Sequence, residues 1–184
     1  MSAAPAFHCD PAEFVGRRAL VTGGTQGIGE ALVRRLREGG ASVVTTARSP
    51  LPDGQSPDLF IQADVGTPRG VEDVIGAVMA RLGGVDILVN SVGGSRAPAG
   101  GALVLDDHEW QRALDVNLLA AVRLDRAFLP GMLERGSGVI LHISSIQRRL
   151  PLFDADGPEV AHTGVPFVNH GIVAALLFLF VLGG

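Results

Sequence analysis

The sequence of 184 residues contains no tyrosine, and because all fifteen of its basic residues are arginines it contains no lysine either. These absences exclude a phenol as proton donor, a lysine that forms a Schiff base, and the lysine of a P-loop. A single cysteine, Cys9, excludes a disulfide framework within the chain and a zinc site built from several cysteines. We interpret Cys9 as an incidental thiol near the N-terminus.

Charge is also scarce, since charged residues make up 18% of the chain and its net charge is −4. A nucleic-acid surface needs a basic face, so we expect no nucleic-acid partner. With 47% hydrophobic residues, a chain of this length predicts one domain with a buried core, and we expect no metal site. Residues 1–18 lack the apolar stretch of a secretory signal, which predicts a cytoplasmic location.

The longest uninterrupted apolar run covers residues 171–182, near the C-terminus. As a helix this run would span about 18 Å, well short of the roughly 30 Å hydrocarbon core of a bilayer. We therefore expect a buried helix or strand there. Membrane association through this segment stays open as an alternative.

Short apolar runs alternate with segments of helical periodicity over the first 150 residues. The predicted strands are 18–22, 41–46, 59–63, 85–89 and 138–143. Helical spacing follows the first and third strands, and two helical stretches are expected between 107 and 134. This alternation predicts an α/β fold with a doubly wound parallel sheet.

A glycine-rich segment, TGGTQGIG at 22–29, connects the first predicted strand to the first predicted helix. Glycines at such a junction allow a tight turn and a close approach of the backbone to a pyrophosphate. The helix N-terminus adds unpaired N–H groups and the positive end of its dipole. The segment therefore indicates a phosphate-binding loop.

This loop resembles the TGxxxGxG cofactor loop of the short-chain dehydrogenase/reductase family. The resemblance implies a Rossmann-like fold and a nicotinamide cofactor. The second strand ends with Ala47 and Arg48, where members that prefer NAD usually carry an acid. A guanidinium pairs with the 2′-phosphate of NADP, so NADP is favoured over NAD. By itself, Arg48 could also be a solvated loop cation.

Further landmarks of the family follow in the same order along the chain. Asp64 and Val65 resemble the pair beside the adenine ring, and NSVG at 90–93 resembles the NNAG motif. Asp64 alone could equally be a helix-start or turn acid. The residues that the resemblance assigns to the cofactor are Gly23, Thr25, Gln26, Gly27, Ile28, Gly29, Arg48, Asp64, Val65, Asn90 and Gly93.

The catalytic half of the family pattern is only partly present. Asn117 and Ser145 match the family's asparagine and serine, although a helix cap and a strand-terminal hydroxyl are the alternatives. The tyrosine and lysine that should follow the serine are replaced by Pro158 and His162. We give His162 and His170 little weight as substitutes, and we interpret His142 as a core histidine.

The resemblance ends soon after residue 150, so we predict a dinucleotide-binding part over 1–150. Residues 151–184 are expected to form an atypical loop and an apolar end. The sheet should then stop after its fifth strand, with 171–182 available to cover that edge as a strand or helix. We hypothesise that the chain beyond Leu152 is a frameshifted or rearranged end.

Three functions stay open on this basis. The first is an NADP-dependent oxidoreductase for a small carbonyl or alcohol, impaired by the missing tyrosine and lysine. The second is a non-catalytic NADP-binding module, and the third is a membrane-associated protein. Neither the substrate nor the oligomeric state can be predicted from the sequence.

Overall fold

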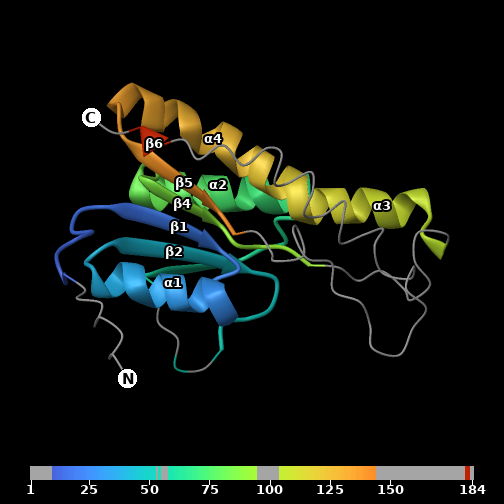
Figure 1. Cartoon of the computed structure of the whole chain (residues 1–184), viewed down its shortest axis with the longest axis horizontal. Helices are drawn as coiled ribbons and strands as arrows, with labels where there is room; N and C mark the ends of the chain where they lie inside the picture. Colours follow the sequence, from blue (N-terminus) through green and yellow to red (C-terminus); the bar gives the residue numbers. More distant parts are fainter. Residues whose placement is uncertain (1–9, 53, 55–57, 95–103, 144–180, 183–184) are drawn as a thin grey trace, which may run out of the picture.

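A computed structural model describes residues 10–52, 54, 58–94, 104–143 and 181–182. Its centre is a parallel sheet of five strands in the order β3-β2-β1-β4-β5 (Figure 1). The strands are β1 (Arg18–Thr22), β2 (Ser42–Ala47), β3 (Leu59–Gln62), β4 (Ile87–Asn90) and β5 (Gly138–His142). The predicted α/β fold with a doubly wound parallel sheet is therefore confirmed: β1 has the predicted bounds, and the bounds of the other strands differ by at most two residues.

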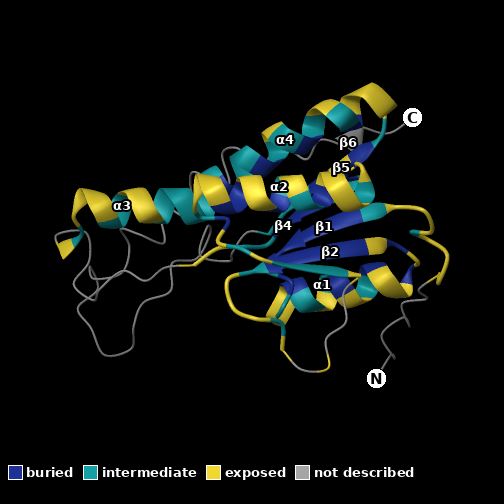
Figure 2. Cartoon of the chain, turned by 180° about the vertical axis from the view of Figure 1, so that it is seen from behind, coloured by how far each residue is buried: buried dark blue, intermediate teal, exposed yellow. Residues whose placement is uncertain are grey.

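The central strands β1, β2 and β4 are largely buried because helices cover both faces of the sheet (Figure 2). On one face, α1 (Gly27–Glu38) packs Val33 and Leu36 against Val21 and Val43. On the other face lie α2 (Pro68–Leu82) and α4 (Ala120–Arg135). Buried side chains of these two helices form the larger core with Leu20, Val44 and Leu88.

The two helical stretches predicted over 107–134 are joined into one rod, which Figure 1 shows as α3 and α4 lying end to end. The α3 helix (Asp107–Leu114) passes into a π-helical turn, η2 (Asp115–Leu119), and this turn leads into α4 without a break. Asn117 therefore lies inside a continuous helical segment, and the helix cap considered as its alternative role is not seen. A π-turn widens the helix locally and frees backbone carbonyls for side-chain partners.

A sixth, short strand lies beside β5 at the edge of the described part of the sheet. Val181–Leu182 form β6, which pairs in antiparallel fashion with Gly138 and Val139. These two residues are the described part of the apolar run 171–182, so this end of the run is a strand. Among the described residues there is no helix long and apolar enough to cross a membrane.

The direction of winding reverses between β1 and β4, since β2 and β3 lie on one side of β1 and β4 and β5 on the other. In open parallel sheets, ligands bind in the crevice outside the carboxyl ends of the strands at this point. The fold therefore directs attention to the segments that follow β1, β2, β3 and β4.

Candidate cofactor site

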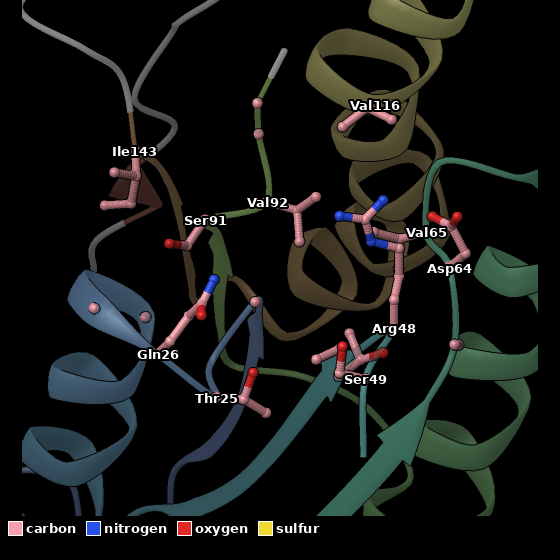
Figure 3. A pocket seen from close by; sticks show the side chains of 18 of the residues that line it. Thr25, Gln26, Arg48, Ser49, Asp64, Val65, Ser91, Val92, Val116 and Ile143 are labelled. Carbon is pink, nitrogen blue, oxygen red and sulfur yellow. The ribbon is translucent and has the colours of Figure 1, made fainter. Parts of the chain in front are cut away.

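A cavity of about 880 Å³ lies at the carboxyl ends of the strands (Figure 3). Its size is in the range of ligand sites in general, which hold roughly 300–1,000 Å³. Most of the predicted cofactor residues line it, namely Gly23, Thr25, Gln26, Gly27, Ile28, Gly29, Arg48, Asp64, Val65 and Gly93. Segments far apart in sequence are thus brought to one place by the sheet.

The glycine-rich loop forms the floor of the cavity at the start of α1. Gly23 has φ +70°, a left-handed conformation that favours glycine. A Cβ on Gly29 would lie 2.2 Å from the carbonyl oxygen of Gly23, so loop and helix touch without room for a side chain. Gln26 precedes the helix in an extended conformation and makes no side-chain cap bond. The backbone can therefore approach a pyrophosphate closely at the helix N-terminus.

The Thr22 hydroxyl connects this loop to the segment after β4. It accepts hydrogen bonds from the backbone N–H groups of Ser91 at 3.0 Å and Val92 at 3.2 Å, and it donates to the Val89 carbonyl at 3.4 Å. Thr22 is fully buried, so these bonds fix the wall formed by residues 91–94 relative to the loop. The sequence analysis did not include Thr22 among the site residues.

The opposite end of the cavity is polar at its rim and apolar inside. Figure 3 shows the Arg48 side chain reaching from the end of β2 into the cavity. Val65 is buried and Val116 of η2 also lines this part. Two valines beside an exposed guanidinium offer apolar contact for a planar ring and a charged partner for a phosphate.

Asp64 lines the cavity and also shapes the start of α2. Its Oδ1 accepts a hydrogen bond from the Gly66 N–H at 2.9 Å, and its backbone carbonyl accepts one from the Thr67 hydroxyl at 2.9 Å. Thr67 in turn caps α2 by accepting from the Gly70 N–H. Asp64 therefore has the turn role considered as its alternative and also lines the cavity, and its role beside an adenine ring stays a prediction.

Asn117 joins the π-turn to the wall of the cavity. Its Oδ1 accepts from the Gly94 N–H at 2.8 Å, while its Nδ2 donates to the carbonyls of Gly94 and Ala113, both at 2.9 Å. The side-chain amide thus uses both of its ends to hold the segment after β4.

Asn90 differs from the other predicted cofactor residues because it lies below the cavity and does not line it. Its Nδ2 donates to Asp125 Oδ1 at 2.9 Å and lies 3.5 Å from His142 Nδ1. His142 Nε2 is 3.4 Å from Asp125 Oδ2. Burial raises the pKa of the Asp125 carboxyl, against the opposing effects of His142 and of the Asn90 hydrogen bond. His142 is thus a core histidine with polar partners, as the sequence suggested.

Several residues at the site were missed by sequence reasoning, and some predicted ones cannot be placed. Ser91 and Val92 line the cavity from inside the motif at 90–93, where they differ from the family's usual residues, and Val116 and Ile143 line it without a motif of their own. Ser145, Pro158, His162 and His170 lie outside the described residues, as does most of 151–184. The division of the chain at residue 150 and the role of Ser145 stay predictions.

Comparison with known proteins agrees with this geometry. A family model described as short chain dehydrogenase matches residues 17–155. A 3-oxoacyl-[acyl-carrier-protein] reductase of Vibrio cholerae is 34% identical over 137 residues, which are 71% of this chain and 55% of that protein. A short chain dehydrogenase of Monascus ruber is 34% identical over 161 residues, 79% of this chain and 53% of that protein.

Among solved structures, L-sorbose reductase from Gluconobacter frateurii, complexed with NADPH and L-sorbose, superimposes with a TM-score of 0.76. It is 30% identical, and the match covers 90% of this chain and 63% of that one. The chain belongs to the short-chain dehydrogenase family, and it spans about half the length of the curated relatives it matches.

Proposed function

We propose that this chain binds NADP(H) in the cavity at the carboxyl ends of β1, β2, β3 and β4. The observation that carries the proposal is the contact between Gly29 and Gly23, where no side chain fits and the backbone is open to a pyrophosphate. The start of α1 would hold the pyrophosphate, and Val65 and Val116 would flank the adenine ring. Family membership supports a nicotinamide cofactor.

The preference for NADP over NAD rests on Arg48. This exposed guanidinium follows β2, at the place where a carboxylate would bind the ribose hydroxyls of NAD and repel a 2′-phosphate. L-sorbose reductase, which has the same fold, was solved with NADPH. The expected partner of the loaded protein is a small carbonyl or alcohol compound, as the membership of a dehydrogenase family suggests.

When bound, the cofactor supplies or accepts a hydride, and the protein has to orient the substrate oxygen and move a proton. By resemblance, Ser145 would hydrogen-bond that oxygen. Asn117 acts as a positioning residue, since its amide is occupied by Gly94 and Ala113. The 184 residues contain neither the phenol nor the ammonium group that complete proton transfer in the family. We therefore propose that turnover by this chain is impaired, with a non-catalytic NADP-binding module as the second candidate.

Cofactor titration tests the binding proposal. NADPH and NADH are titrated into the protein while cofactor and Trp110 fluorescence are followed. We expect NADPH to bind more tightly than NADH. Arg48→Gln should lower the affinity for NADPH at least tenfold, as expected for a lost charged hydrogen bond, and leave the affinity for NADH unchanged. Arg81→Gln is the matched control, because Arg81 is exposed in the last turn of α2, away from the cavity. An equal loss for both cofactors would contradict the role given to Arg48.

Oxidation of NADPH in the presence of a panel of small ketones and aldehydes separates the two candidates. Slow turnover that disappears in Ser145→Ala would support an impaired oxidoreductase. NADPH binding without any carbonyl-dependent oxidation would support the non-catalytic module. Rates in the range usual for enzymes, about 1–1,000 per second, would contradict the proposed impairment while leaving cofactor binding intact.

A further inference from the structure

Three polar side chains from three elements meet beneath the wall of the cavity: Asn90 at the end of β4, Asp125 on α4 and His142 at the end of β5. Asn90 and His142 are directly opposite each other in the parallel register of β4 and β5. Each immediately precedes a residue that lines the cavity, Ser91 in one case and Ile143 in the other. The cluster is therefore placed to affect the wall without touching the cofactor.

Counting donors and acceptors gives the protonation of the cluster that matches the observed orientation of the Asn90 amide. The Asn90 Nδ2 group carries only donors, and it faces both Asp125 Oδ1 and His142 Nδ1. With the amide oriented in this way, the matching form of His142 is a neutral ring that accepts at Nδ1 and carries its proton on Nε2, which faces Asp125 Oδ2. Asp125 accepts from both partners, and this arrangement requires a neutral His142.

One atom of the cluster has no partner in this arrangement. The Oδ1 atom of Asn90 is buried and accepts no hydrogen bond from any described residue. Rotating the amide by half a turn would bring Oδ1 toward His142 Nδ1, but it would also place that oxygen against Asp125 and remove the 2.9 Å bond between Asn90 and Asp125. The cluster thus has two possible arrangements, selected by the proton on His142 Nδ1.

We propose that the cluster of Asn90, Asp125 and His142 supports the cofactor wall in a pH-dependent manner, with protonation of His142 releasing the tie between Asn90 and Asp125. A protonated ring carries N–H groups on both nitrogens, so Nδ1 would oppose the donors of Asn90. The amide then rotates to offer Oδ1, and the end of β4 loses its bond to α4. This inference rests on the proposed function, because it concerns the affinity of the same cavity.

The loss of this bond matters because, in the described part of the chain, two side-chain contacts tie the end of β4 and the wall to the helical rod. One is the contact of Asn117 with Gly94, and the other is the bond between Asn90 and Asp125. Among the described residues, Asp125 is the one charged group in contact with the His142 ring, and Asn90 is its other polar partner. Burial raises the pKa of the Asp125 carboxyl, so a variant at His142 is needed to separate the contribution of the ring from that of the carboxyl.

The test compares wild type with His142→Asn, whose side-chain oxygen can accept from Asn90 but cannot bind a proton in this range. The dissociation constant of NADPH is measured for both proteins from pH 8 to pH 5.5. The NADPH phosphate titrates in this range, but it affects both proteins equally, so its effect cancels in the ratio of the two constants at each pH. We expect the wild type to lose about three- to tenfold more affinity than the variant on acidification, the effect of one lost hydrogen bond. A ratio that does not change with pH would overturn the proposal.

A second measurement needs no variant. In protein with ¹⁵N-labelled histidine, the ring nitrogens of His142 should show the Nε2–H tautomer at pH 8 and the doubly protonated ring at low pH. A proton on Nδ1 at pH 8 would overturn the proposal even if the variant did not fold. Failure of the wild type to bind NADPH at pH 8 would instead refute the proposed function, and the tautomer measurement would still decide on the cluster.

Discussion

At the scale of single residues, the site depends on glycines, whose lack of a side chain lets backbone segments come into close contact. The clearest case is Gly29, where a methyl group would lie 2.2 Å from the Gly23 carbonyl oxygen, far inside contact distance. The neighbour is backbone and cannot move aside without displacing the loop. The close contact of loop and helix therefore requires glycine at this position.

The substitution Gly29→Ala should consequently weaken NADPH binding at least tenfold and lower the melting temperature, because the loop must shift away from the helix start. Gly76→Ala is the matched control, since a Cβ at Gly76 in α2 meets nothing within 4 Å. That control should raise stability by roughly 0.5–1 kcal/mol through the better helix propensity of alanine, with unchanged affinity. Fluorescence titration and thermal unfolding measure both. Normal affinity in Gly29→Ala would contradict the role of the loop.

The same scale shows what the sequence could and could not predict about the site. Residues 23–29 are a local motif, so their spacing alone places them together at a strand–helix junction. Thr22, Val116 and Ile143 become part of the site only through contacts between elements that lie far apart in the chain. Asn90 matched a motif, yet its side chain turns to Asp125 and His142 below the cavity. A motif gives the position of a residue, whereas the direction of its side chain depends on packing.

At the scale of elements, the amino ends of β1 and β4 are held by a network of charges opposite the cavity. Arg18 contacts Asp86 through Nε at 2.9 Å and Nη2 at 2.7 Å, and Arg135 Nη2 lies 3.3 Å from the same carboxylate. The hydrogen bond from Arg18 holds the pKa of the Asp86 carboxyl below its usual value. Asp86 therefore binds a proton less readily in the folded state than in the unfolded chain.

From this follows a dependence of stability on pH. The contribution of Asp86 is complete above the unfolded pKa of aspartate, about 4, and it is lost as the pH falls through the lower pKa of the folded state. Asp86→Asn should lower the free energy of unfolding by about 1.5–3 kcal/mol at pH 7. The substitution removes a charged hydrogen bond and leaves the Arg18 guanidinium without its carboxylate partner. The difference from wild type should shrink below about pH 4. Urea unfolding at several pH values measures this difference in the free energy of unfolding, with Asp73→Asn at an exposed position as the control. A difference that stays constant with pH would refute the role given to the Asp86 carboxylate.

The π-turn is the second element whose effect can be measured separately. Asn117→Ala removes the three hydrogen bonds to Gly94 and Ala113, so the wall of residues 91–94 should loosen. We expect faster hydrogen exchange of the Gly94 amide, whose partner is Asn117 Oδ1, together with a loss of about threefold or more in NADPH affinity. Gln111→Ala is the control, since Gln111 is exposed and its amide bonds, among the described residues, only the carboxylate of Asp115. Unchanged exchange at Gly94 would show that the wall does not depend on this turn.

At the scale of the whole molecule, the order of apolar strands and amphipathic helices was enough to predict the architecture. The prediction worked because strands buried on both faces leave short runs rich in apolar and β-branched residues, such as 18–22 and 42–47. The join between α3 and α4 was not predictable in the same way, because a π-turn has no sequence period of its own. Which form the apolar run 171–182 takes beside β5 also depended on an edge that only the folded sheet defines.

The same whole-molecule view predicts that cofactor binding and folding are linked, since the cavity is built from segments that follow five different strands. A ligand that binds only the folded state stabilises it by about 2.7 kcal/mol at one hundred times its dissociation constant. For a chain of this size that amounts to a rise of roughly 5–10 °C in melting temperature. At the same NADPH concentration, Arg48→Gln should show about half of this rise, because a tenfold weaker site gives about 1.4 kcal/mol. An undiminished rise in that variant would place NADPH away from Arg48, and no rise in wild type would refute cofactor binding at this cavity.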